Sequence, residues 1–174
     1  CKEEPEKLFQ KAKRNIATGS LRRRAQWLNR FPNDALHNLR GNVQTRMRKL
    51  EENDWDAAIF ALAGLKRMNM IRPPYYILDW MLSAPAQGIV TTACRENDGE
   101  CRNALKQINN KNSEIQARAE RKFLNLMEGG CTAPIGAYAA IGEDQIELEI
   151  MVHSVDGQDA VHLKIEQDNM NREA

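Results

Sequence analysis

The sequence contains few cysteines and no long apolar run. Its four cysteines, Cys1, Cys94, Cys101 and Cys131, lie far apart and form no C-x-x-C pair. This spacing argues against a zinc site and against a small scaffold held by disulfides, so we expect reduced thiols. No apolar run is long enough to cross a bilayer, and the N-terminus lacks the apolar core of a signal peptide. We therefore expect a cytoplasmic location and no membrane partner.

The sequence also lacks an excess of charge of either sign, and aromatic residues are scarce. Lys and Arg number 25 against 24 Asp and Glu, which gives a net charge of +1. The whole molecule thus has no field that would draw it onto nucleic acid, and few aromatic side chains lie near the arginines to stack on bases. We expect no nucleic-acid partner, and any anion site must be local.

The length and the apolar content indicate a folded protein. A chain of 174 residues with 42% hydrophobic residues can form one ordinary domain or two small ones. It begins without methionine and shows no closing element at its end, so we expect a fragment of a longer protein.

A unit of strand, tight turn and helix occurs three times in the first half, after a basic amphipathic helix at residues 6–15. Strands that alternate with helices imply a mainly parallel sheet with right-handed crossovers. The predicted strands are residues 15–18, 35–39 and 56–62, and the helices that follow them begin after Ser20, at Val43 and near Leu65.

The second half has a different pattern. Helical spacing between Cys101 and Met127 is broken near residues 109–112, and residues 145–152 alternate polar with apolar. Asp156 and Gly157 then predict a hairpin turn into a further strand at residues 160–165. The fold class predicted is α/β, with a parallel-sheet domain followed by a small α+β domain that has an antiparallel sheet.

The segment between these halves contains a linker and one more predicted strand. Residues 83–88 are typical of a linker, and residues 89–94 predict the strand. We expect domains at residues 1–88 and 107–174, with residues 89–106 as a connecting segment.

Arginines follow the predicted strands at Arg22, Arg23, Arg40, Arg46 and Arg67. Ligands of open α/β sheets bind at the carboxyl ends of the strands, where these residues are expected to lie. Cations at helix N-termini oppose the helix dipole, so their presence favours a bound anion beside them. The pattern predicts a site for a ligand with several carboxylates or phosphates. The alternative is a solvated basic face.

A glycine-rich turn at residues 128–136 contains Cys131. Gly129 and Gly130 permit positive φ, and Pro134 and Gly136 prevent a continuous helix from covering the sulfur. The turn favours attachment or nucleophilic chemistry at an accessible thiol. The alternative is a small buried side chain after a helix end.

Five segments of the chain together resemble the porphobilinogen deaminase (hydroxymethylbilane synthase) family. They occur in that family's order, and the resemblance extends from Ile16 to about Ile165. The segments are Thr18 to Gln26, Asn38 to Arg46, Ala63 to Arg67, Pro85 to Gly88 and Leu126 to Cys131.

The resemblance implies an enzyme of tetrapyrrole biosynthesis. Such an enzyme joins four porphobilinogen molecules head to tail, with loss of ammonia, into hydroxymethylbilane on a dipyrromethane primer. The primer would be a cofactor held by a thioether to Cys131, and Arg22, Arg46 and Arg67 would bind substrate. The other residues implied for cofactor binding are Thr18, Ser20, Arg22, Arg23, Arg40 and Arg46.

The resemblance also implies a scaffold like that of periplasmic binding proteins. This chain matches only part of the length of a family member. The family's first domain, with its catalytic aspartate, has no counterpart here, and residues 89–106 would return to that domain. No catalytic residue can be assigned. We expect this chain alone to be inactive, although the complete protein would be a transferase and a monomer.

Two other classes of function stay open at this point. A non-catalytic module could bind a small polycarboxylate on the same scaffold, and it would not need an exposed thiol. A nucleic-acid-binding protein would show affinity that falls steeply with salt. Substitution of Cys131 distinguishes the first of these from the transferase.

Overall fold

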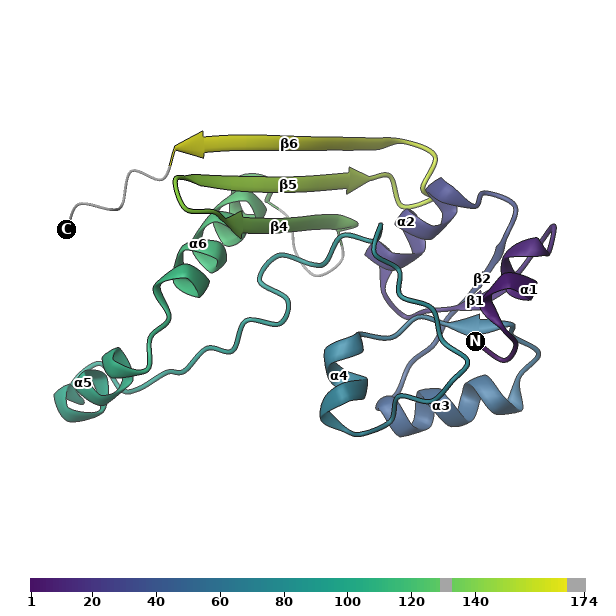
Figure 1. Cartoon of the computed structure of the whole chain (residues 1–174), viewed down its shortest axis with the longest axis horizontal. Coiled ribbons are helices and arrows are strands. Elements are labelled where there is room, and N and C mark those ends of the chain that lie inside the picture. The colour runs from purple at the N-terminus through teal and green to yellow at the C-terminus, as the bar shows by residue number, and fades with distance from the viewer. Residues whose placement is uncertain (129–132, 169–174) are drawn as a thin grey trace. The chain divides into compact units, whose positions relative to one another are not determined.

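The computed structural model describes residues 1–128 and 133–168. The chain forms two compact units, each with its own sheet (Figure 1). The first unit contains residues 1–81 and 152–161 together with residues 133–134. The second contains the described residues of the ranges 82–130, 135–151 and 162–174.

The first unit is built on a three-stranded parallel sheet. Its strands are β1 (Asn15–Ala17), β2 (Ala35–His37) and β3 (Ala57–Ala58), in the order β2-β1-β3. Ile16 of the central strand lies opposite Leu36 on one side and Ala57 on the other. The side chain of Ile16 is fully buried, which places the core of this unit around β1.

Four helices belong to this unit. Ser20 and Asn42 are the N-caps of α2 and α3, and each side chain accepts a hydrogen bond from a backbone N–H three residues later. Trp27 of α2 packs in the core with Leu8 of α1. The helices are α1 (Pro5–Gln10), α2 (Leu21–Arg30), α3 (Val43–Glu52) and α4 (Leu62–Arg67).

Four elements of this unit are shorter than the sequence predicts: β1 and β2 by one and two residues, and α1 and β3 by more. The helix expected at residues 6–15 ends at Gln10, because the chain becomes extended at Lys11 before it enters β1. The strand expected at residues 56–62 has only two residues, since β1 offers it a partner no further than Ala17. Helix α4 therefore begins at Leu62, earlier than predicted.

The second sheet is antiparallel, as the alternating pattern predicts. Its strands β4 (Ile135–Ile141), β5 (Gln145–His153) and β6 (Ala160–Asp168) lie side by side in that order, with alternating directions (Figure 1). Two helices precede it, α5 (Gly99–Gln107) and α6 (Lys111–Leu126), and α6 packs against β4. The break between α5 and α6 falls where the sequence predicts it, whereas β4 was not expected.

A buried carboxylate joins three segments of the second unit. Glu120 of α6 is only 3% exposed and accepts hydrogen bonds from the backbone N–H groups of Ala86 and Ala139. A backbone bond from Ala137 to the Ser83 carbonyl (3.0 Å) runs beside it. The segment around Ala86 is thus fixed to both α6 and β4.

The prediction of a strand at residues 89–94 is wrong. The structure gives these residues no regular secondary structure, and Val90 is 90% exposed. A strand requires a neighbour to satisfy its backbone groups, and no described strand pairs with this segment. Its β-branched residues alone do not produce a strand.

Candidate anion-binding site at the strand ends

The turn after β1 brings Thr18, Gly19 and Ser20 to the carboxyl end of the parallel sheet. Thr18 is buried, and its N–H donates to the His37 carbonyl at 2.9 Å. Its Oγ1 accepts from the backbone N–H of Ser20 at 3.3 Å, while Ser20 Oγ accepts from the N–H of Arg23 at 3.4 Å. The first turn of α2 is therefore held by both hydroxyl side chains.

Gly19 allows this turn to touch the turn after β2. A Cβ at this position would lie 2.3 Å from the backbone oxygen of Leu39, closer than any real side chain approaches. Leu39 itself is fully buried. The two turns thus meet through their backbones, which sets the spacing between the beginnings of α2 and α3.

The turn after β2 presents the first residues of α3. Gly41 has a φ of +123°, a conformation that favours glycine, and Asn42 Oδ1 accepts from the N–H of Thr45 at 2.8 Å. Arg46 Nε donates to the Gly41 carbonyl at 2.7 Å. This bond draws the guanidinium group of Arg46 back toward the beginning of its own helix.

Three of the arginines predicted from the sequence come together here. Arg22 is 7% exposed, and burial, followed by the charge of Arg23, lowers its pKa to about 10. Burial also lowers the pKa of Arg23, followed by the charge of Arg46. Arg23 Nη1 reaches the carbonyl of Ile59 at 3.1 Å, just beyond β3. The charge of Arg23 thus acts on Arg22 and the charge of Arg46 acts on Arg23, so the three arginines form a cluster of positive charge.

The helix termini add to the same positive potential. The first turns of α2 and α3 contain no acidic residue, although acidic residues are the ones that helix N-termini favour. Arg23 and Arg46 instead donate to backbone carbonyls, which do not neutralise a charge. A cluster that is half-buried, cationic and adjacent to two helix N-termini is suited to binding an anion with several oxygens.

The remaining predicted residues lie differently. Arg40 is exposed in the turn between β2 and α3, and its carbonyl accepts from Lys49 Nζ at 3.1 Å. Arg67 is exposed at the last residue of α4, so the expectation that it lies just inside the beginning of that helix is wrong. The early start of α4 moves it there. Cys131 lies outside the described residues.

The backbone carbonyls of Gly41 and Ile59 orient two of the arginines, and nothing in the sequence marks them for this role. Every residue has a carbonyl, so no residue type signals such an acceptor.

A buried ion pair at the amino end of the sheet was also not predicted. Asp34 Oδ2 accepts from Arg14 Nε at 2.7 Å and from Trp27 Nε1 at 2.8 Å, and Oδ1 accepts from the N–H of Arg14 at 2.9 Å. The guanidinium of Arg14 also lies 4.3 Å from the ring centre of Phe31. Arg14 and Asp34 neutralise each other immediately before β1 and β2.

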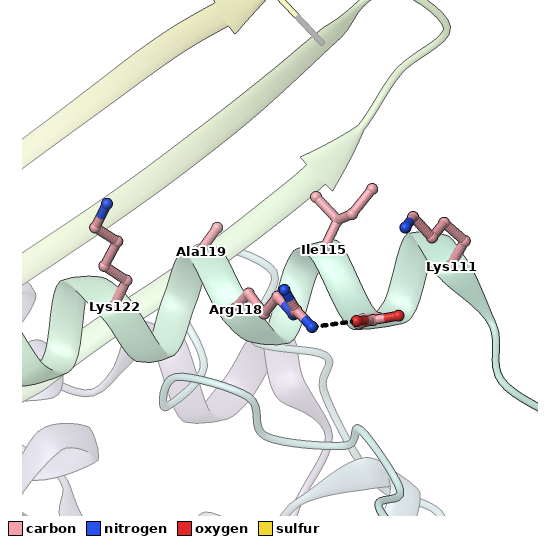
Figure 2. A pocket seen from close by; sticks show the side chains of 6 residues that line it. Lys111, Ile115, Arg118, Ala119 and Lys122 are labelled. Atoms are coloured by element: carbon pink, nitrogen blue, oxygen red, sulfur yellow. Dashed lines mark ion pairs between the residues drawn. The ribbon is translucent and has the colours of Figure 1, made fainter. Parts of the chain in front are cut away.

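The second unit has a basic hollow on the surface of α6 (Figure 2). Its volume is about 280 Å³, and Arg118 forms an ion pair of 2.6 Å with Glu114 there. All of its residues come from one helix, and we assign no role to it. The lining residues are Lys111, Glu114, Ile115, Arg118, Ala119 and Lys122.

Residues 1–128 and 133–168 provide neither a metal cluster nor a membrane span. No group of three or more His, Cys, Asp or Glu side chains in these ranges could hold a metal ion. No helix formed by these residues is both long enough and apolar enough to cross a membrane.

The fold and the candidate site define an α/β protein with a cluster of arginines at the carboxyl ends of parallel strands. The family model described as "Porphobilinogen deaminase, dipyromethane cofactor binding domain" matches residues 3–103, and "Porphobilinogen deaminase, C-terminal domain" matches residues 114–174. The chain belongs to the porphobilinogen deaminase family.

Curated proteins give the same result. The chain is 42% identical to the porphobilinogen deaminase of Geobacillus kaustophilus over 83% of its own length and 48% of the relative's. It is 44% identical to the porphobilinogen deaminase of Brevibacillus brevis, and the match covers 82% of this chain and 47% of the relative. The chain is 44% identical to the chloroplastic porphobilinogen deaminase of Oryza sativa, and the match covers 74% of this chain and 37% of the relative. The chain spans about half the length of the bacterial relatives it matches, and less of the plant one.

Proposed function

We propose that this chain is the part of a hydroxymethylbilane-forming transferase that holds the growing pyrrole chain during tetrapyrrole biosynthesis. The observation that carries the proposal is the cluster of Arg22, Arg23 and Arg46 at the strand ends. Porphobilinogen carries two carboxylates, an acetate and a propionate. A chain of such units requires fixed cations at several points, and guanidinium groups bind carboxylates in a bidentate manner.

The proposed cofactor is dipyrromethane, attached by a thioether to Cys131. When bound, it supplies the primer whose free end is extended by each new pyrrole. The described residues fit such a group, because the depressed pKa values of Arg22 and Arg23 reflect charges that a carboxylate would stabilise. Thr18 and Ser20 hold the first turn of α2 from the same position.

The roles proposed for the arginines follow from burial and position. Arg22, Arg23 and Arg46 lie close enough together to share the carboxylates of one ligand. Arg40 is exposed beside Gly19, and we assign it to the cofactor as well. Arg67 is exposed on α4, which suits a later-arriving substrate better than a resident group.

We further propose a cytoplasmic location, porphobilinogen as the substrate, and no nucleic-acid or membrane partner. Support comes from the net charge of +1 and from the absence of a membrane-spanning helix in the described part of the chain. The rice relative is named as chloroplastic, so family membership alone does not fix the compartment.

An intact-protein mass spectrum of the purified chain tests the proposal. We expect an adduct equal in mass to two linked pyrroles on the wild type, and none on Cys131→Ser. Cys101→Ser is the matched control, since this helix α5 residue lies outside the proposed site and should retain the adduct.

Porphobilinogen binding measured by calorimetry completes the test. Cys131→Ser should still bind it through the arginines, while Arg22→Gln combined with Arg46→Gln should not. An unmodified wild type that also fails to bind porphobilinogen contradicts the proposal. Binding without an adduct would support the non-catalytic polycarboxylate module only if a longer chain that includes the family's first domain also lacks the adduct, because this chain alone is expected to be inactive.

A further inference from the structure

The turn between β5 and β6 packs directly on helix α2. Residues 152–161, which contain this turn, belong to the same compact unit as the parallel sheet. Gly157 is buried, with a φ of +77°. A Cβ on Gly157 would lie 2.6 Å from the carbonyl oxygen of Ala25 and 2.9 Å from Cβ of Leu28. The backbone of the turn thus touches the helix itself, and a side chain cannot fit between them.

A hydrogen bond reinforces this contact. Asn29 Nδ2 donates to the Gly157 carbonyl at 3.0 Å, across 128 positions of the sequence. Asn29 is exposed near the end of α2, where a side chain usually faces only solvent. The turn therefore contacts α2 both by packing and by a directed bond.

The turn is rigid because its own side chains hold it. Ser154 Oγ donates to Asp156 Oδ1 at 2.5 Å, and the same carboxylate oxygen accepts from the N–H of Gln158 at 3.1 Å. The N–H of Asp159 donates to Ser154 Oγ at 3.0 Å. The hydrogen bond from Ser154 and, after it, that from the N–H of Gln158 hold the pKa of Asp156 below its ordinary value.

Helix α2 is the element that carries Arg22 and Arg23 in its first turn. It has ten residues and is about 15 Å long, so it moves as one rigid body. The turn touches Ala25, Leu28 and Asn29, which lie two to seven residues, or up to about two helical turns, beyond the arginines. A shift of the helix at this contact changes the position of Arg23 relative to the Ile59 carbonyl that it reaches at 3.1 Å.

We propose that the Ser154–Asp159 turn is a positioning element of the anion site, which fixes the placement of α2 and thereby of Arg22 and Arg23. Gly157 supplies the close approach and Asn29 supplies the directed bond. The proposal rests on the proposed function, because it concerns the affinity of the same arginine cluster for its carboxylate ligand.

Porphobilinogen affinity of the full 174-residue chain, measured by calorimetry well below the melting temperature, tests the proposal. Gly157→Ala should weaken binding about five- to tenfold, in the range of modest coupling between two sites. Asn29→Ala, which leaves the turn intact and removes one hydrogen bond, should weaken porphobilinogen binding about two- to threefold. The Nε–Hε resonances of Arg22 and Arg23 should shift in both variants, a signature that a purely structural role would not produce.

Two glycine variants serve as controls. Gly88 has a φ of +97°, and a Cβ there would have no atom within 4 Å, so the melting temperature of Gly88→Ala reports backbone strain alone. Gly99 also has open space around it, and Gly99→Ala should bind porphobilinogen like the wild type. Any fall in stability of Gly157→Ala beyond that of Gly88→Ala reports the collision with α2.

The outcomes separate this inference from the function on which it rests. A wild type that does not bind porphobilinogen contradicts the proposed function. A wild type that binds, with folded Gly157→Ala and Asn29→Ala of unchanged affinity and unchanged arginine resonances, overturns the positioning role. Should Gly157→Ala fail to fold, Asn29→Ala and the arginine resonances decide the question.

Discussion

Arg22 illustrates how the site places a charge where the unliganded fold does not favour it. Its pKa is lowered to about 10, first by burial and then by Arg23. A base with a depressed pKa in the folded state binds its proton more tightly in the unfolded state. The charged guanidinium therefore lowers stability at every pH below about 10, and this penalty diminishes as the pH rises from that value toward the ordinary pKa of arginine. A bound carboxylate removes the penalty in another way, because it stabilises the charge.

Above neutral pH, ligand affinity should consequently change only where Arg22 loses its proton. Porphobilinogen binding should be constant from about pH 7 to about pH 9 and fall by up to about tenfold per pH unit above about 10, as Arg22 loses its proton. Calorimetry across this range measures it, with circular dichroism to confirm that the chain stays folded. Affinity that rises above about pH 10 would contradict the assignment of Arg22.

Asp34 should be among the most sensitive positions of the parallel-sheet unit. Its carboxylate accepts three hydrogen bonds from Arg14 and Trp27, and its side chain is fully buried. Asp34→Ala leaves the Arg14 charge buried and unpaired and should cost about 3–5 kcal/mol in urea denaturation. Asp54→Ala, at an exposed position, should cost less than about 0.5 kcal/mol. Equal losses in the two variants would show that the buried pair does not stabilise the fold.

At the scale of the elements, the chemistry of the turns was the part most readily predicted. The helix after the first strand was expected to begin after Ser20, and it does so, with the Ser20 side chain as its N-cap. The turn at Asp156 and Gly157 was expected from the sequence and is present between β5 and β6. Turn and cap residues act through their own backbone and immediate neighbours, so sequence alone contains the relevant physics.

The elements that were predicted wrongly depend on partners far away in the sequence. Residues 89–94 have strand composition but no described strand beside them, whereas the small residues of β4 form a strand because β5 pairs with them. The length of β3 is limited by β1, and the position of Arg67 changes with it. Pairing between strands is a tertiary property that local composition does not fix.

The contact between the first two turns gives a prediction at the same scale. Gly19→Ala places a methyl group 2.3 Å from the Leu39 carbonyl oxygen if the backbone does not move, and it should destabilise the chain by about 1–3 kcal/mol. Gly64→Ala in α4 meets no atom within 4 Å and should stabilise that helix by about 0.5–1 kcal/mol. Thermal denaturation of both variants measures the difference. A stable Gly19→Ala would mean that the two turns can move apart.

At the scale of the whole molecule, charge is balanced and the positive potential is local. The family was predictable because five motifs occur in order, and the family models match residues 3–103 and 114–174. The proximity of Arg22, Arg23 and Arg46 was predictable, because arginines after successive strands converge at one edge of a sheet. Their individual environments were not, since the burial of Arg22 and the exposure of Arg67 arise only after packing.

The balanced charge predicts weak attraction to polynucleotides. Fluorescence anisotropy with a labelled single-stranded oligonucleotide should show no binding at about 0.15 M salt, because a net charge of +1 releases few counterions. Porphobilinogen binding under the same conditions is the positive control. Oligonucleotide affinity that falls steeply with salt would instead favour a nucleic-acid-binding protein.

The central strand β1 has one more consequence, for the kinetics of hydrogen exchange. Every ladder of the parallel sheet includes this strand of three residues, and Ile16 and Ala17 are fully buried. The hydrogen bonds of amides in such a central, buried strand open only when the surrounding unit unfolds, so we expect these amide hydrogens to exchange most slowly. Thr18 follows directly after them. The turn of the candidate site is thus attached to the strand whose amides we expect to exchange most slowly, and the exchange rate of the Thr18 amide measures this.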